Sequence, residues 1–356
     1  MKKNLTINEI AKIANVSRGT VDRVVNKRGY VAEDKQKQIE KIIKEYNFTP
    51  NTHARNLALS KSLKVAVILP EHTVGEYWEP IVNSTETAGR NYLPFGLKIS
   101  YYFYDQNNID SFKNIEKTVF IEKYSAIITS QPQNASIKAF LRKCTTKKIP
   151  FVLLGTNNTK YGALSSLGQD ATQGGRLAGK LINYGQESKA KYLIFNIYNE
   201  QNINPNVVSR IEGFKSYFKE NKKIKTDLIN LSINDENLSA KIMEKLSTLT
   251  KNDGIFIPNS RAHIVAKLLT KENKVRFLAF DLVKDNIQYL KEGVIDFLIN
   301  QKPYEQGYRG VELLYRYLAT FQEPQKIINI PAEVITIENL TFDEESDFTD
   351  KEKTSA

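Results

Sequence analysis

From Leu63 onward the sequence alternates short apolar runs, rich in β-branched residues, with amphipathic stretches of helical period. This alternation is typical of parallel sheets whose strands are joined by crossover helices. Seven runs predict buried strands, at residues 64–69, 97–104, 126–129, 151–154, 191–197, 254–257 and 276–280. So many units favour an α/β core of two lobes, each a doubly wound parallel sheet, over one compact sheet. Ligands of such folds bind at the carboxyl ends of the strands.

The first sixty residues have a different pattern, with short helical periods in place of strand runs. Thr6 and Glu9 are spaced as a capping box at the start of a first helix. Ser17 is a suitable N-cap for a second short helix that follows after a tight turn. We therefore predict an all-α helix-turn-helix head over residues 1–49 and a hinge helix or linker over 50–61.

Charge is concentrated in this head. The chain carries a net charge of +11, and residues 1–60 hold twelve Lys or Arg against six Asp or Glu, hence +6. A basic end on a nearly balanced body indicates a polyanionic partner such as double-stranded DNA, through release of counterions from phosphates. The alternative is a solvated lysine-rich surface.

Several classes of protein are disfavoured by what the sequence lacks. Cys144 is the single cysteine, so neither an intrachain disulfide nor a cysteine metal cluster can form. The three histidines are scattered without metal spacing, and we expect no cofactor, no metal and no enzymatic activity. Without a signal peptide or an apolar run long enough to span a membrane, the chain is expected to be cytoplasmic and to have no membrane partner.

Three motifs of the head are specific in their spacing: TINEIAKIANVSRGTVDRVVN at 6–26, GYV at 29–31 and FTPNTHARNL at 48–57. Together they resemble the DNA-binding head of the lactose-repressor/galactose-repressor (LacI) family of transcriptional regulators. The resemblance implies that the second helix lies in the major groove of an operator. The positions expected to contact DNA are Thr6, Ser17, Arg18, Gly19, Thr20, Arg23, Asn26, Tyr30, Asn51, His53, Arg55 and Leu57.

Base recognition is expected from the arginines of the second helix. Arg18 or Arg23 can donate twice to the O6 and N7 atoms of guanine, although either could instead contact phosphate. Two positions depart from the commonest family pattern. Gly19 stands where a long polar side chain is frequent, and Asp22 stands where serine is usual. The operator sequence of other members therefore does not transfer to this chain.

The segment that matches the hinge of the family has one notable apolar residue. In the family two copies of this segment fold on the operator and insert paired leucines into the minor groove, and Leu57 is the matching residue. An apolar wedge between base steps kinks DNA at a cost of a few kcal/mol that further contacts offset. Without the resemblance, Leu57 would be interpreted as a packing residue.

Downstream, five ordered motifs stand at 167–179 (LGQDATQGGRLAG), 210–214 (RIEGF), 259, 280–281 (FD) and 300–307 (NQKPYEQG). They resemble the periplasmic-sugar-binding-like core of the same family over roughly residues 63–340. The resemblance implies a small polar effector between the lobes, contacted by Tyr77, Trp78, Asp170, Arg210, Asn259, Asp281 and Gln301.

The chemistry of these side chains suits a polyol. Asp281 can accept from two hydroxyls, Arg210 and Gln301 can donate, and Asn259 can do both. Tyr77 and Trp78 either stack on a sugar ring or pack in the core, and Asp170 serves either the hinge or the ligand. Pentose-binding relatives carry an Asp-Arg pair where this chain has Gly155-Thr156. A hexose, a sugar acid or another small polar metabolite therefore remains open.

The boundaries that follow are a core over 62–342, a first lobe of 62–167 and 300–325, a second lobe of 168–299 and 326–342, and a disordered tail over 343–356. We expect a homodimer on a near-palindromic operator, because two identical heads read two-fold related half-sites. A repressor is the first hypothesis, and an activator or a corepressor-dependent regulator has the same sequence features. A solute-binding protein for transport would need an export signal and no DNA-binding head.

Overall fold

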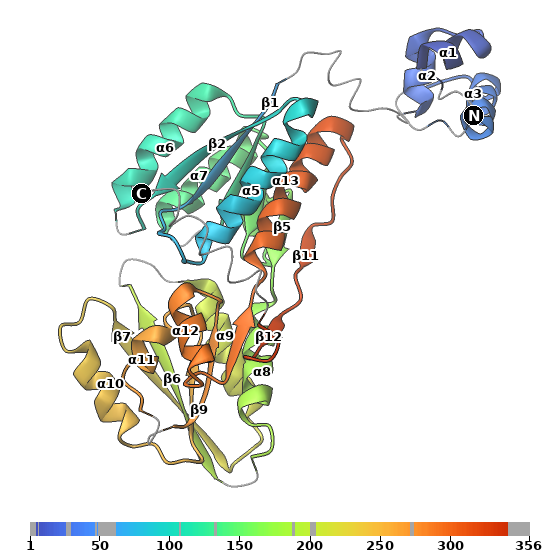
Figure 1. Cartoon of the computed structure of the whole chain (residues 1–356). Coiled ribbons are helices and arrows are strands. Elements are labelled where there is room, and N and C mark those ends of the chain that lie inside the picture. The colour runs from blue at the N-terminus through green and yellow to red at the C-terminus, as the bar shows by residue number, and fades with distance from the viewer. Residues whose placement is uncertain are drawn as a thin grey trace, which may run out of the picture. The chain divides into compact units, whose positions relative to one another are not determined.

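The structure is a computed structural model that describes residues 5, 7–25, 30–46, 48, 62–106, 108–131, 134–186, 189–199, 204–270 and 274–340 (Figure 1). The chain forms two compact units, residues 1–61 and residues 62–356. The predicted hinge at 50–61 and the predicted disordered tail lie outside the described residues.

The smaller unit contains the helices α1 (Ile7–Ile13), α2 (Arg18–Val25) and α3 (Glu33–Glu45). Its core is an apolar cluster that includes Ile10, Val21 and Ile39, one from each helix and all fully buried. In the turn before α2, Asn15 has a φ of 49°, a left-handed conformation that asparagine adopts more readily than most residues. The predicted helix-turn-helix head is confirmed.

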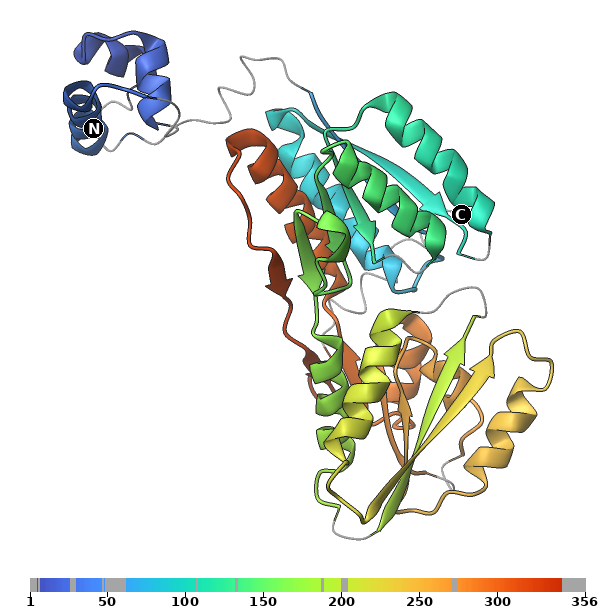
Figure 2. The same cartoon turned by 180° about the vertical axis from the view of Figure 1, so that it is seen from behind.

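The first lobe of the larger unit contains a six-stranded sheet in the order β11-β5-β4-β3-β1-β2. Its strands are β1 (Leu63–Pro70), β2 (Leu97–Tyr104), β3 (Ala126–Ser130), β4 (Phe151–Leu154), β5 (Ser165–Gly168) and β11 (Ile327–Asn329), all parallel. Its helices are α5 (Trp78–Tyr92), α6 (Ile109–Glu122), α7 (Ala135–Thr146) and α13 (Pro303–Thr320). Helices α5 and α13 cover one face and α6 and α7 the other (Figure 2).

The second lobe repeats this plan with the order β12-β10-β9-β8-β6-β7. Its strands are β6 (Ala190–Tyr198), β7 (Ile224–Ser232), β8 (Gly254–Ile257), β9 (Arg276–Phe280), β10 (Phe297–Asn300) and β12 (Glu333–Ile335), and β12 is antiparallel to β10. Its helices are α8 (Ala171–Ile182), α9 (Pro205–Tyr217), α10 (Leu238–Leu246), α11 (Ala262–Ala266) and α12 (Lys284–Lys291). The predicted pair of doubly wound lobes is confirmed.

The chain passes between the lobes three times, and one passage corrects a predicted boundary. Strand β11, at Ile327–Asn329, pairs with β5 of the first lobe, and only β12 returns to the second. The prediction that 326–342 belongs as a whole to the second lobe is therefore wrong for 327–329. Hydrogen bonds tie the passages together, from the Gln169 amide to the Asn300 carbonyl (2.7 Å) and from the Ile330 N–H to the Gly168 carbonyl (2.9 Å).

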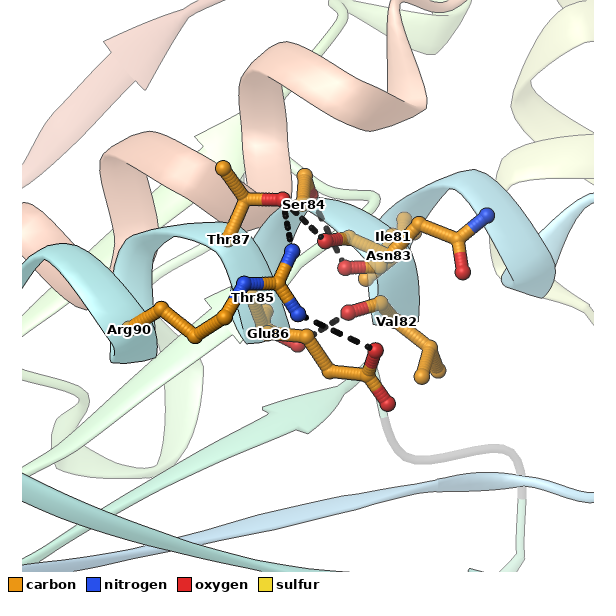
Figure 3. A network of polar contacts seen from close by, with 8 residues as sticks. All are labelled: Ile81, Val82, Asn83, Ser84, Thr85, Glu86, Thr87 and Arg90. Atoms are coloured by element: carbon orange, nitrogen blue, oxygen red, sulfur yellow. Dashed lines mark hydrogen bonds and ion pairs between the residues drawn. The ribbon is translucent and has the colours of Figure 1, made fainter. Parts of the chain in front are cut away.

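Helices α5 and α13 pack at very short range because small residues meet at their crossing. A Cβ atom on Gly307 would lie 2.1 Å from Ser84 Oγ and 2.6 Å from the Ile81 carbonyl oxygen. The hydroxyls of Ser84, Thr85 and Thr87 donate to carbonyls of their own helix, so these polar atoms are satisfied at the contact (Figure 3). This crossing fixes the start of α5, where Tyr77 and Trp78 lie. No helix in the described part of the chain is long and apolar enough to cross a membrane.

Candidate functional site

A cavity of about 570 Å³ lies between the two lobes, at the carboxyl ends of strands from both sheets. Six of the predicted effector residues line it: Tyr77, Trp78, Arg210, Asn259, Asp281 and Gln301. Asp170 is not among the lining residues. Its side chain accepts a hydrogen bond from the Gln173 N–H (3.0 Å) and caps α8, which favours the hinge interpretation of this residue.

The second lobe contributes a buried charged group to the cavity. Arg210 on α9 is 3% exposed and Asp281, directly after β9, is 5% exposed. Arg210 Nη1 donates to the Pro258 carbonyl (2.9 Å), and its guanidinium lies 3.9 Å from the centre of the Phe280 ring. Gln301 Nε2 donates to Asp281 Oδ1 (2.5 Å). These contacts hold both ionisable side chains in place without any ligand.

Burial and mutual attraction act against each other on this pair. Burial raises the pKa of Asp281, and the Arg210 charge and the Gln301 hydrogen bond lower it. Burial lowers the pKa of Arg210, and the charge of Asp281 raises it. Asp281 therefore depends on Arg210 and Gln301 to remain ionised in the interior, whereas the Arg210 guanidinium stays protonated.

Asn286, which the sequence did not single out, supports the backbone around Asp281. Asn286 on α12 is fully buried, and its amide nitrogen donates to the carbonyls of Ser260, Phe280 and Asp281 (3.1–3.2 Å). Asp281 has a φ of 75°, an unusual conformation for a residue other than glycine. The Asn286 amide fixes the backbone on both sides of this strained residue, so Asn286 acts as a positioning residue.

The first lobe contributes two aromatic side chains, Tyr77 and Trp78, to the cavity. Tyr77 and Trp78 meet edge to face, with ring centres 5.0 Å apart. Among the described residues, the Tyr77 hydroxyl has no well-formed hydrogen bond, although it is buried. Burial and the nearby Asp281 charge raise the pKa of this hydroxyl far above its ordinary value, with opposing contributions from Arg210 and Gln306. Tyr77 is thus a neutral polar group facing the cavity.

Gly155, where the sequence departs from pentose-binding relatives, is held by residues of distant elements. Its N–H donates to Gln306 Oε1 (2.8 Å), and its carbonyl accepts from the Asn206 side chain of the other lobe (2.5 Å). The fully buried Gln306 also donates to the Gln301 carbonyl (2.7 Å). The φ of Gly155 is 75°, a left-handed backbone conformation that a residue without a Cβ atom adopts readily. The sequence did not predict the roles of Asn206 and Gln306.

The lobes also touch at the rim of the cavity. The Lys284 N–H, at the start of α12, donates to the Gly75 carbonyl of the first lobe (3.1 Å). Gly75 is held in turn by its own N–H, which donates to Glu79 Oε2 (2.7 Å). Together with the bond from Asn206 to Gly155, this contact describes a closed arrangement of the lobes.

Other polar side chains of the lining were missed by sequence reasoning. They include Gln106, Gln131, Asn196, Asn230 and Arg261, each at or just beyond the carboxyl end of a strand. The rule that ligands of open α/β sheets bind at this edge could have found them. In the part of the chain that the structure describes, no group of three or more His, Cys, Asp or Glu is placed to hold a metal ion.

In the head, the structure describes half of the predicted DNA-contacting positions. Ser17, Arg18, Gly19 and Arg23 are exposed along α2, and Thr20 is half-buried. The Ser17 hydroxyl accepts from the Thr20 N–H (3.1 Å) and so caps the helix. Tyr30 is 89% exposed. The remaining predicted positions, Thr6, Asn26, Asn51, His53, Arg55 and Leu57, lie outside the described residues.

Comparison with protein families places both units. The model of the periplasmic binding protein domain matches residues 65–323, so the larger unit belongs to that class of two-lobed ligand-binding domains. The model of bacterial regulatory proteins of the lacI family matches residues 6–51. With this head ahead of that core, the chain belongs to the LacI family and is a DNA-binding transcriptional regulator.

Individual relatives agree with this assignment. The chain is 26% identical over 348 residues to the ribose operon repressor of Lactococcus lactis subsp. lactis, covering 94% of this chain and 98% of that protein. A candidate LacI transcriptional regulator from Bacteroides fragilis has a similar fold, with a TM-score of 0.70, 24% identity and coverage of 78% and 98%. The glucose-galactose binding protein GanP of Geobacillus stearothermophilus matches with a TM-score of 0.66, 23% identity and coverage of 79% and 99%.

Proposed function

We propose that this regulator is a repressor whose affinity for its operator is controlled by a carbohydrate bound between the lobes. The observation that carries the proposal is the arrangement of Arg210, Asp281 and Gln301 opposite Tyr77 and Trp78 in one cavity. Charged and amide groups can bond the hydroxyls of a sugar, while an aromatic face can pack against its apolar side. The ribose operon repressor and the glucose-galactose binding protein support a sugar as the ligand.

Base recognition is assigned to the exposed arginines of α2. Both arginines are exposed, Arg18 at the first position of α2 and Arg23 on the side of the helix opposite the buried Val21. A bidentate arginine contact to guanine discriminates between bases by about 1–3 kcal/mol. The hydroxyl of Thr20 and the exposed Tyr30 are assigned to the sugar-phosphate backbone, where they position the head without specifying sequence.

A ligand can change DNA binding only through a difference in its affinity for two arrangements of the protein. The cavity is lined from both lobes, so a bound sugar stabilises the closed arrangement that the Gly75 to Lys284 contact describes. We assign the transmission of this change to a homodimer, in which two heads read a near-palindromic operator.

The test combines DNA selection with titration. Operator DNA is selected from a random pool with the full chain, and its binding is measured by fluorescence anisotropy at fixed salt, with and without monosaccharides. We expect Arg23→Ala to weaken binding to the selected DNA far more than binding to random DNA. Arg142→Ala, an exposed arginine of the larger unit, is the control with the same loss of charge. Equal losses on both DNAs for Arg23→Ala, or operator binding indifferent to every sugar, would contradict the proposal.

A further inference from the structure

The charged side chains of the cavity lining differ in how far a ligand can reach them. Among the described lining residues, Arg210, Arg261 and Asp281 carry a charge, so two cations face one anion. Arg210 and Asp281 are 3% and 5% exposed, whereas Arg261 is half-buried. The charge that is most accessible to a ligand is therefore positive, and it belongs to Arg261.

The guanidinium of Arg261 lies at the carboxyl end of β6. Its Nη1 atom donates to the Ile197 carbonyl (2.7 Å), and Ile197 itself lines the cavity. The backbone N–H of Arg261 donates to Asn259 Oδ1 (3.1 Å), which fixes the base of the side chain. A guanidinium has five N–H donors. Because the bond to Ile197 is the one that it makes among the described residues, most of its donors remain for a ligand.

In the part of the chain that the structure describes, Arg261 has no ion-pair partner. Burial lowers the pKa of Arg261, and the charge of Glu76 in the opposite lobe acts against this effect. Glu76 is exposed, and its Oε2 atom accepts from the Thr73 N–H (2.8 Å) rather than from the guanidinium. Arg261, which stays protonated, is thus a partly dehydrated cation that gains from an anionic partner.

Amide side chains line the same end of the cavity. Asn196 on β6 and Asn230 on β7 are register partners, and Asn196 Nδ2 donates to Asn230 Oδ1 (2.9 Å). Asn199, just beyond β6, is also a lining residue. Amides can donate hydrogen bonds and carry no negative charge that would repel an anion. An arginine with amides beside it can bind a carboxylate or a phosphate through two or more charge-assisted bonds.

The strand order separates this cation from the group assigned to the sugar hydroxyls. Arg210 bonds the Pro258 carbonyl just after β8, and Asp281 directly follows β9. Arg261 is bonded instead to β6, which β8 separates from β9 in the sheet. Two strand spacings amount to about 10 Å. A sugar whose ring hydroxyls bond Asp281 therefore reaches Arg261 through a substituent on the far side of its ring.

We propose that the effector carries an anionic group bound by Arg261, so that the cavity prefers a sugar acid or a sugar phosphate to the neutral parent sugar. This inference rests on the proposed carbohydrate effector and narrows it, because the sequence leaves a hexose and a sugar acid equally open. Carboxylate and phosphate share the chemistry that an arginine recognises, a set of acceptor oxygens with negative charge. Arg261 is thereby the residue that determines specificity.

Calorimetric titration of the full chain with matched ligands tests the inference. The sets are D-galactose with D-galacturonate, D-glucose with D-glucuronate and glucose 6-phosphate, and D-ribose with ribose 5-phosphate. We expect at least one anionic sugar to bind at least about 10-fold more tightly than its neutral parent, because hydrogen bonds to a charged group are strong. The uronates and the phosphates distinguish the two acidic groups.

The outcomes of this titration separate the inference from the proposed function. If every neutral sugar that binds does so as tightly as its anionic counterparts or more tightly, the inference is overturned and the proposed function stands. If no member of any set binds, the proposed function itself is overturned.

A charge-removing variant tests the assignment to Arg261. In Arg261→Gln the Ile197 carbonyl keeps the Asn259 Nδ2 donor (3.0 Å), so we expect the variant to fold, and thermal denaturation checks this. The preferred anionic ligand should lose at least about 10-fold in affinity relative to its neutral parent. Arg261→Lys keeps the charge without the planar fork and should retain part of the preference.

A matched control removes the same charge far along the sequence. Arg142, an exposed arginine of α7, does not line the cavity, and Arg142→Gln should leave the preference for the anionic ligand as it is. Equal losses for the anionic and neutral ligands in Arg261→Gln would make Arg261 a structural residue and overturn the assignment. A similar loss of preference in Arg142→Gln would overturn it as well.

Discussion

The two halves of the cavity differ in how completely the protein itself satisfies them. On the second-lobe side, Arg210 and Asp281 are held by the Pro258 carbonyl, by Gln301 and by Asn286 beneath them. On the first-lobe side, the Tyr77 hydroxyl and Gln131 Oε1 have no well-formed bonds within the described chain. The comparison teaches that the second-lobe half is largely preorganised by its own bonds, whereas the first-lobe half keeps polar side-chain atoms that the protein does not bond even with the lobes closed.

The largest effect is expected from breaking the preorganised half. Arg210→Met leaves Asp281 buried without its cation, so we expect the free energy of unfolding to fall by about 3–5 kcal/mol. Sugar affinity should fall roughly 30-fold or more, because a buried hydrogen-bonded charge is lost. Urea denaturation and calorimetry measure the two effects. The double variant Arg210→Met/Asp281→Asn should recover much of the stability but not the binding. If Arg210→Met were as stable as the parent protein, the claim that Arg210 stabilises the buried Asp281 would be contradicted.

The next largest effect is expected where α8 packs closely against the backbone of α9 at Arg210. A Cβ atom on Gly175 would lie 2.0 Å from the Arg210 carbonyl oxygen, so Gly175→Ala must push α8 and α9 apart. We expect a loss of about 1–3 kcal/mol in stability and a clear loss of sugar affinity. Gly179→Ala is the matched control one turn along α8, where the added atom meets the Tyr217 side chain (2.9 Å). Equal affinity in both variants would show that this crossing does not position the arginine.

A smaller effect concerns the contact between the halves. A Cβ atom on Gly75 (φ +87°) would lie 2.8 Å from Lys284 Cβ, which obstructs the closed arrangement. We expect Gly75→Ala to weaken sugar binding about 10-fold, because closure loses its fit. Gly293→Ala is the control, since Gly293 has a similar φ of +72° and nothing within 4 Å. Small-angle scattering with and without sugar should show impaired closure in the first variant alone. Closure as complete as in the control would contradict the assignment.

The smallest effect is expected from removing the Tyr77 hydroxyl on the first-lobe side of the cavity. Tyr77→Phe removes a buried hydroxyl that has no well-formed bond within the protein, so the free energy of unfolding should stay the same or rise slightly. If the hydroxyl bonds the ligand, sugar affinity should fall by about 2- to 10-fold. Thermal denaturation and calorimetry separate these outcomes. A clear loss of stability with unchanged affinity would instead make Tyr77 a structural residue of the first lobe.

Local patterns in the sequence predicted the elements whose signals are strong and continuous. The apolar runs at β1, β4 and β8 bury every or nearly every side chain, so composition alone marks them as strands. In contrast, β5 reads Ser-Ser-Leu-Gly and β7 buries only Ile224 and Leu231 of its nine residues, and neither strand was predicted. Strand β11 has three residues of which two are exposed, and only its pairing with β5 makes it part of the sheet.

The same division holds for the site. By itself the sequence determined the head and the two lobes, because their elements have strong local patterns, and its resemblance to the LacI family implied Arg210, Asp281 and Gln301. Tertiary structure alone decided that Gln306 and Asn206 hold Gly155, since these partners are separated by 151 and 51 positions. It also brought the Gly75 carbonyl of the first lobe to the Lys284 N–H of the second. Pairings at such separations depend on how two lobes close on each other, and no period along the chain records that geometry.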